Sequence, residues 1–190
     1  MSASVTRPDR YGTVAIALHW LIGVALLAQI AFGFLLDDLA PRGTPGRTSV
    51  INLHKSIGIV LGVLILARLA WRLRHRPPAW PADFAGARAR LATLGHRALY
   101  ACMVGVPLSG YVASNFTRHG VRFFGNPLPP WGPDDRAVYV FFNGLHVTLA
   151  IALTLLIAGH IAIAIGHAFR DRGALFGRMW PAHPASARRT

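Results

Sequence analysis

The chain has 190 residues, of which 53% are hydrophobic and only 14% are charged, and its formal net charge is +13. This composition excludes an intrinsically disordered protein, because disorder combines low hydrophobicity with high net charge. It also argues against a soluble domain, in which about 25% of the residues are usually charged. The apolar residues are therefore expected to form segments that cross a membrane.

Four long apolar segments follow one another along the chain. Each has about the 20 mostly apolar residues that a helix needs to cross the hydrocarbon layer of a bilayer. The first is too long for a cleaved signal peptide and lacks the small-residue cleavage site. The loops contain several prolines and are too short to hold a folded domain. We therefore predict an all-α membrane protein, a single domain over residues 1–190 with four transmembrane helices at roughly 13–36, 50–73, 91–114 and 137–168.

Most cationic residues lie at one end of this predicted bundle. Thirteen fall before the first helix, around the second loop or in the tail, and six fall in the other two loops; the thirteen are Arg7, Arg10, Arg72, Arg74, Arg76, Arg88, Arg90, Arg97, Arg170, Arg172, Arg178, Arg188 and Arg189. Because cationic loops are retained on the cytoplasmic side, both termini are expected in the cytoplasm. This asymmetry and the anionic lipid of the bilayer account for the net charge, so nucleic acid is not expected as a partner.

The single cysteine, Cys102, lies within the third predicted helix. One cysteine excludes a disulfide framework and a thiolate metal cluster, and the Cys-x-x-Cys-His motif of covalently attached haem is absent. Any haem must therefore be held by coordination and packing.

Four of the nine histidines lie in the predicted membrane helices well away from the polar loops: His19, His54, His146 and His160. An ionisable residue in hydrocarbon is costly and indicates a functional site, although any one of them alone could be a neutral histidine bonded to a neighbouring carbonyl. His146 and His160 are 14 residues apart. At 3.6 residues per turn they share one helix face, about 21 Å apart along the axis.

The directions of the helices pair these histidines by depth. His19 lies near the start of a helix that runs outward, so it matches His160 near the cytoplasmic end of the fourth helix. His54 lies near the start of a helix that runs inward, so it matches His146. Two imidazoles at one depth could bind zinc, copper or haem iron. Structural zinc requires four ligands, whereas a b-type haem requires two axial nitrogens, so we predict two non-covalent haems, each bound by two histidines.

Small residues follow two of these histidines at helical spacing. Gly23 comes four residues after His19, and Gly58 and Gly62 come four and eight after His54. The absence of a side chain there would let a porphyrin face approach the backbone. The alternative is that these glycines simply permit close packing of membrane helices.

Two arginines lie at the depth of His19 and His160. Arg68 comes 14 residues after His54, and Arg72 lies one turn further. Either could neutralise haem propionates, or both could extend to the lipid headgroups.

Several segments combine into a recognisable pattern between residues 13 and 181. They are His19-Trp20, HKSIGIVLGVLILARLAWRLRHRPP from His54, LGHRALY from Leu94, FFGNPLPP from Phe123, His146, His160, and HAFRDRGALFGRMWP from His167. Together they resemble the prokaryotic cytochrome b561 family, the four-helix di-haem cytochromes of the bacterial inner membrane.

The resemblance implies that the four membrane histidines are axial haem ligands. It also implies exchange with ubiquinone near the cytoplasmic haem and oxidation of superoxide on the periplasmic side. His96 and His167 match positions of the family as well, but neither has a predicted pairing partner at its depth. No role is assigned to His75, His119 and His183.

With both axial positions filled, the iron has no open site, so the remaining chemistry is outer-sphere transfer of single electrons. The leading hypothesis is transfer from superoxide to quinone. Lys55, the only lysine, together with Arg118 and Arg122, could raise the local concentration of a small anion, or these cations could be ordinary solvated loop residues.

Two other functions are considered. One is a quinol-linked cytochrome or membrane anchor that exchanges electrons with a periplasmic or hydrogenase-like protein. The other is a scaffold or transporter without redox activity, whose histidines relay protons or bind metal. The absence of Asp and Glu from the predicted spans argues against the last one, because proton paths usually contain an acidic residue.

Overall fold

The computed structural model describes residues 10–75, 77–81, 84–170 and 175–181. Some residues of the sequence-based predictions lie outside these ranges. They are Arg7, Arg76, Arg172, Arg188 and Arg189 of the charge asymmetry, and His183.

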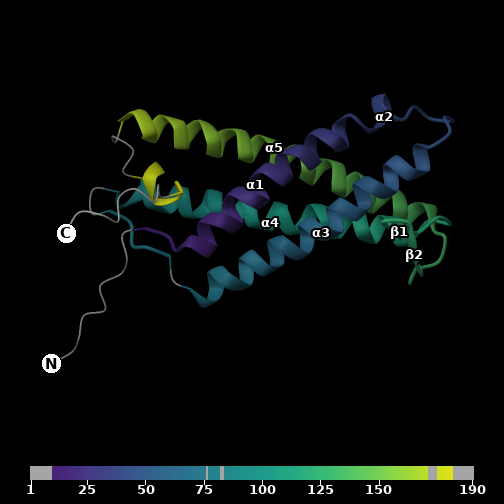
Figure 1. Cartoon of the computed structure of the whole chain (residues 1–190), viewed down its shortest axis with the longest axis horizontal. Helices are drawn as coiled ribbons and strands as arrows, with labels where there is room; N and C mark the ends of the chain where they lie inside the picture. The colour runs from purple at the N-terminus through teal and green to yellow at the C-terminus, as the bar shows by residue number, and fades with distance from the viewer. Residues whose placement is uncertain (1–9, 76, 82–83, 171–174, 182–190) are drawn as a thin grey trace.

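The described residues are mostly helical and form an elongated bundle (Figure 1). Its long helices are α1 (Thr13–Phe34), α3 (Arg47–Arg74), α4 (Ala87–Asn115) and α5 (Arg136–Arg170). Each of them begins and ends within a few residues of a predicted helix. The smaller elements are α2 (Leu36–Leu39), a two-stranded antiparallel hairpin of β1 (Val121–Phe123) and β2 (Asn126–Leu128), and the 3-10 helix η1 (Phe176–Arg178). The hairpin and η1 were not predicted.

Glycines and prolines fix the limits of the helices. α3 and α4 start directly after Gly46 and Gly86, whose φ angles of 90° and 66° are readily adopted only by glycine. α3 stops at Arg74, shortly before Pro77 and Pro78, which have no amide hydrogen to donate to a preceding turn.

Three helices in the described part of the chain are long and apolar enough to cross a membrane: Thr13–Phe34, Arg47–Arg74 and Arg136–Phe169. α4 is not among them. It is 29 residues long but contains Pro107 and buries Ser109, Ser114 and Asn115. Length and composition thus support three crossings, whereas four were predicted.

Apolar side chains cover the outside of the bundle, and the buried core is small. Val24 of α1, Val63 of α3 and Leu155 of α5 are each more than 60% exposed, as expected for helices that face lipid. The core consists of Ile22, Leu26, Leu61, Ile65 and Leu153. In sequence these residues fall between His19 and Gly33 on α1, between His54 and Arg68 on α3, and between His146 and His160 on α5. The apolar core therefore lies midway along the bundle.

The two ends of the bundle differ. At one end, which we call the arginine-rich end, α1 starts and α3 and α5 stop (Figure 1). The segment 175–181 returns to α1 there, because Tyr11 N–H donates to Arg178 O at 3.3 Å and Trp20 Nε1–H donates to Met179 O at 2.8 Å. The hairpin end carries α2, β1 and β2.

Candidate functional site

The structure brings the four membrane histidines together as two pairs at two levels of the bundle. The ring centres of His19 and His160 are 6.2 Å apart at the arginine-rich level. Those of His54 and His146 are 6.3 Å apart at the hairpin level. α5 contributes one ring to each pair.

This separation fits one metal ion between two imidazoles. With a metal–nitrogen bond of about 2.0 Å, as for imidazole on zinc, and about 1.1 Å from the nitrogen to its ring centre, two rings on opposite sides of a metal would have centres about 6.2 Å apart. Among the described residues, no group of three or more His, Cys, Asp or Glu side chains is placed to hold a metal ion. The donor sets therefore suit a cofactor that takes two axial nitrogens better than a four-ligand zinc ion.

His146 is hydrogen-bonded to α4 next to the proline within that helix. Its Nδ1–H donates to Val106 O at 2.8 Å, which leaves Nε2 unprotonated and available as a metal ligand. Pro107 interrupts the amide ladder at this point. A Cβ atom on Gly110 would lie only 2.8 Å from His146 Nδ1, so the ring fits because residue 110 is glycine.

His54 is enclosed mainly by residues of α1. A Cβ atom on Gly33 would lie 3.1 Å from His54 Cε1. The Phe32 ring centre is 5.6 Å away. The amide nitrogen of Gln29 lies 3.1 Å from His54 Nδ1 and 2.7 Å from its backbone oxygen.

At the other level, Arg68 lies against His19. Its guanidinium donates to Ala15 O at 3.0 Å and to Tyr100 Oη at 3.2 Å, and one of its nitrogens is 3.4 Å from His19 Nδ1. Arg68 is half-buried and bonded within the bundle, so its guanidinium is directed to the site and not extended to the headgroups. Arg72 lies over the Tyr100 ring at 5.6 Å.

His96 belongs to the same level. Its ring centre is 5.5 Å from that of His160, and its Nδ1–H donates to Ala92 O at 2.6 Å. The expectation that His96 has no partner at its depth was therefore wrong. The reason is that α4 and α5 lie side by side and bring the two rings together (Figure 1). The ring of His167 contacts Phe84, with ring centres 5.7 Å apart.

The same 14-residue spacing recurs in each of the four long helices. Gly33, Arg68, Gly110 and His160 each follow a histidine of the same helix by 14 residues. The arginine-rich level thus receives His19, Arg68, His96 and His160, and the hairpin level receives Gly33, His54, Gly110 and His146. Sequence reasoning applied this spacing to α3 and α5 only and so missed Gly33 and Gly110. Gln29 was also missed, and the signal for it is a polar residue within an apolar helix.

The three predicted glycines do not border a histidine ring. A Cβ atom would meet nothing within 4 Å at Gly23, Gln29 Nε2 at 3.6 Å at Gly58, and Pro107 Cβ at 3.4 Å at Gly62. Gly58 and Gly62 therefore lie at contacts between helices. Their role beside a porphyrin stays a prediction.

Comparison with known proteins identifies the family. The model of the prokaryotic cytochrome b561 family matches residues 10–182. The chain belongs to this family. Its members are electron-transferring membrane cytochromes that bind b-type haem.

Three relatives cover nearly the whole cytochrome. Cytochrome b561 homolog 2 of Escherichia coli K12 is 30% identical over 90% of this chain and 92% of its own length. Cytochrome b561 homolog 1 of the same strain is 25% identical over 91% and 98%. The probable superoxide oxidase CybB of Yersinia pestis is 26% identical over 90% and 96%.

The cations predicted to attract an anion lie at the hairpin end of this cytochrome, and two of them have partners. Lys55 Nζ donates to Gly120 O at 2.9 Å and is half-buried. Arg118 pairs with Asp134 at 2.6 Å on the surface. The side chain of Arg122 is exposed, while its backbone oxygen accepts from Ser56 Oγ at 3.1 Å. Lys55 is therefore the cation that is fixed beside His54.

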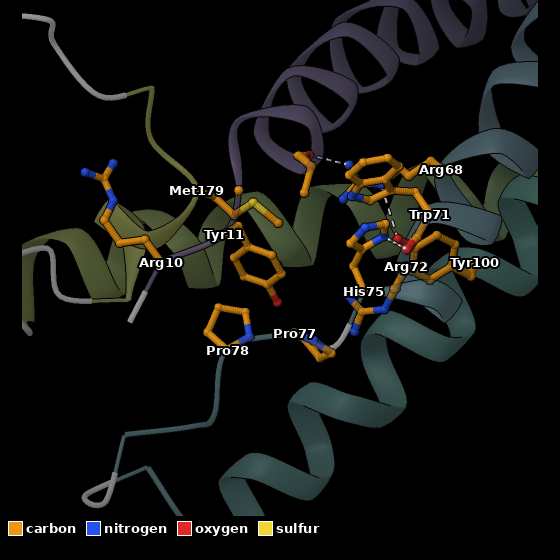
Figure 2. A pocket seen from close by; sticks show the side chains of 12 residues that line it. Arg10, Tyr11, Arg68, Trp71, Arg72, His75, Pro77, Pro78, Tyr100 and Met179 are labelled. Carbon is orange, nitrogen blue, oxygen red and sulfur yellow. Dashed lines mark hydrogen bonds between the residues drawn. The ribbon is translucent and has the colours of Figure 1, made fainter. Parts of the chain in front are cut away.

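A cavity of about 210 Å³ opens at the arginine-rich end (Figure 2). Its lining comes from the start of α1, the end of α3, α4 and the segment 175–181, and includes Tyr11, Arg68, Trp71, Arg72, Tyr100 and Met179. Arg68 lines this cavity and also touches His19. The cavity and the His19–His160 pair are thus neighbours.

Proposed function

We propose that this cytochrome binds two b-type haems in the bacterial inner membrane and transfers single electrons from superoxide in the periplasm to ubiquinone on the cytoplasmic side. The observation that supports it most is the presence of two histidine pairs, with ring centres 6.2 and 6.3 Å apart, at two levels of one bundle. A membrane-spanning electron route requires carriers at two depths, and a single metal site would not supply them.

The proposal includes α4 as a fourth crossing. At 1.5 Å per residue its 29 residues extend about 43 Å, which exceeds the thickness of the hydrocarbon layer. It packs along α5, so its buried serines and Pro107 face protein and not lipid. The arginine-rich end is then cytoplasmic by the distribution of cations, and both chain ends lie on that side.

Each histidine pair would hold one haem through its two imidazoles, His19 with His160 and His54 with His146. When bound, haem would supply reversible one-electron oxidation and reduction of its iron. Arg68 and Arg72 would neutralise its carboxylates at the arginine-rich level through charge-assisted hydrogen bonds. Val106 O fixes the tautomer of His146 in advance.

On the periplasmic side, Lys55 is the residue that we expect to attract superoxide. It follows the ligand His54 directly, and its ammonium group is held by Gly120 O. A fixed positive charge raises the local concentration of a small anion and therefore its rate of encounter. One relative is named a probable superoxide oxidase, which agrees with this choice of donor.

On the cytoplasmic side, the cavity beside Arg68 is the proposed site of ubiquinone. Aromatic walls and a few convergent polar groups are typical of small-molecule sites. Trp71 and Tyr100 supply the aromatic surface, and the hydroxyl of Tyr11, which also lines the cavity, supplies a hydrogen-bond donor for a quinone oxygen. Because Arg68 also contacts His19, an electron would have only a short distance to cover.

Haem quantitation on the purified protein tests the ligand assignment. The wild type should contain two haems per chain, and His54→Ala and His160→Ala should each lose one. His119→Ala, which alters an exposed loop histidine, is the matched control and should keep both. Retention of two haems by either ligand variant, or a colourless wild type, would overturn the proposal.

Stopped-flow reduction by enzymatically generated superoxide tests the donor. We expect a near-diffusional rate that falls with salt, a several-fold slower rate in Lys55→Gln, and no change in Arg118→Gln, whose charge is already paired. A slow rate without salt dependence would favour the alternative, in which a periplasmic or hydrogenase-like protein exchanges the electrons.

A further inference from the structure

His75 lies where the cavity at the arginine-rich end meets solvent. α3 ends directly before it, and Pro77 follows two positions later. Its side chain is exposed, and it also lines the cavity together with residues from the start of α1 and from α4 (Figure 2). The imidazole of His75 therefore connects the inside of the cavity with the water outside the bundle.

Trp71, one turn earlier in α3, fixes the orientation of this imidazole. The two rings are stacked, with their centres 3.9 Å apart and their planes at 13° to each other. His75 Nδ1 lies 3.0 Å from Trp71 O, and because a carbonyl oxygen can only accept, Nδ1 carries the proton of this hydrogen bond. The other ring nitrogen, Nε2, is therefore the one that can take up a proton and release it.

The other charged and titratable groups of the cavity are guanidinium and phenol groups. They come from the segment before α1, from α3 and from α4, and they are Arg10, Tyr11, Arg68, Arg72 and Tyr100. No carboxylate lines the cavity within the described ranges of the chain. A guanidinium group does not release its proton in proteins. Histidine, in contrast, ordinarily gains and loses a proton near neutral pH, so His75 is the group of this cavity that is suited to proton exchange.

Reduction of a quinone requires protons as well as electrons. In the proposed reaction, two superoxide ions lose one electron each and leave as dioxygen. Ubiquinone takes up both electrons and two protons, one on each carbonyl oxygen, and becomes ubiquinol. An acid within hydrogen-bond reach of the reacting oxygen typically accelerates such a proton transfer about 10²- to 10⁴-fold. A histidine that both faces the quinone and reaches water meets this need.

We propose that His75 is a catalytic residue for ubiquinone reduction, because its ring, stacked on Trp71, lines the cavity and also reaches cytoplasmic water. Nε2 takes a proton from that water and donates it to one carbonyl oxygen of ubiquinone. The proton for the other oxygen comes from water at the open side of the cavity. The exposed imidazole is then protonated again from solvent. The inference rests on the proposed function, which assigns ubiquinone to this cavity.

Stopped-flow oxidation of the reduced cytochrome by ubiquinone-1 tests this role without superoxide. The protein is reduced with dithionite, freed of excess reductant and mixed with ubiquinone-1 at several pH values. His75→Gln keeps a polar group near the position of Nε2 but cannot be protonated there. At saturating ubiquinone-1 and about pH 6 it should be oxidised about tenfold more slowly than the wild type, and the half-saturating ubiquinone-1 concentration should not change. Arg74→Gln, which alters the exposed neighbour of His75, is the matched control and should keep the wild-type rate.

The pH profile separates proton donation from a structural effect. The ratio of the wild-type rate to the His75→Gln rate should be largest in acid and approach one above about pH 8, because Nε2 carries a proton only while the imidazole is charged. Added imidazole should restore part of the rate of His75→Gln. A ratio that is the same at every pH, or a variant as fast as the wild type at about pH 6, would overturn the inference. A wild type that holds two haems but is not oxidised by ubiquinone-1 would instead overturn the proposed function, and the inference with it.

Discussion

The two histidine pairs have nearly the same separation and very different surroundings. At the hairpin level the groups against the rings are neutral, namely the Val106 carbonyl, the Gln29 amide and two glycines, and the ammonium group of the adjacent Lys55 is bonded to Gly120 O. At the arginine-rich level a guanidinium, a phenol and a third histidine surround His19 and His160. The two pairs therefore have the same spacing between their rings but differ in the charge of the groups around them. A nearby cation favours the reduced iron, so we expect the arginine-rich haem to have the higher potential and electrons to move toward it.

The largest effect should come from adding a methyl group beside a histidine ring at the hairpin level. Gly110→Ala would place a methyl group 2.8 Å from His146 Nδ1, and the ring, held by Val106 O, would have to move. The haem content should fall from two to one per chain, with the haem at the arginine-rich level retained. Haem quantitation and the two midpoint potentials measure this.

The control for that variant lies on the same helix. Gly95→Ala adds the same methyl group to α4 where nothing lies within 4 Å, so both haems should be retained. If Gly110→Ala also keeps both, the close fit at the hairpin level is not what holds His146.

A smaller effect should come from a change in charge at the arginine-rich level. Arg68→Gln removes a guanidinium that bonds to Ala15 O and Tyr100 Oη and lies against His19. Removing a nearby cation disfavours the reduced iron, so the potential of this haem should fall, and loss of a hydrogen bond of the charged guanidinium should cost the protein about 1.5 to 3 kcal/mol of stability. Arg68→Lys should restore part of the potential, because it keeps the charge and loses the planar fork. If the potential of the hairpin-level haem shifts instead, the proposed electrostatic difference between the two levels is wrong.

The smallest effect should come from the ion pair of Arg47 with Asp37, which joins α3 to α2 at the surface of the hairpin end. Arg47 donates to Asp37 Oδ1 at 2.7 Å, and this hydrogen bond, followed by the guanidinium charge, lowers the pKa of the Asp37 carboxyl. A lowered pKa in the folded state stabilises the protein above the ordinary carboxyl pKa of about 3.9, and this contribution disappears as the pH falls through the folded value.

Thermal unfolding of Asp37→Asn measures that contribution. The wild type should have a slightly higher Tm than the variant at neutral pH, and the difference should vanish in acid. The haem spectra should be the same in both proteins. A spectral change in Asp37→Asn would show that surface charge at this end reaches the ring pair.

The sequence was sufficient for the features that depend on one helix at a time. Apolar length located the long helices, and the 14-residue spacing placed His146 and His160 on one face. Features that depend on contacts between two helices were harder to predict from the sequence. Gly33 and Gly110 matter because of rings that other helices bring to them, and the periodicity of one helix does not reveal its neighbours.

The hairpin was missed for a local reason. Its strands are three residues long, too short for alternation to be recognised. Its turn has Phe124 at a φ of 47°, where Asn, Asp or Gly would have been a signal. The hydrogen bond from Phe124 N–H to Ser56 Oγ holds this turn against α3, and that is a tertiary contact.

The sharing of α5 by both ring pairs has a consequence for biogenesis. α5 is the last of the long helices to leave the ribosome, so neither pair can form until residues 136–170 have been inserted next to the earlier helices. A nascent chain halted before that point would present His19 and His54 without opposite rings. Cofactor loading at either pair must therefore follow synthesis of residues 136–170, and a chain terminated before them should bind no haem.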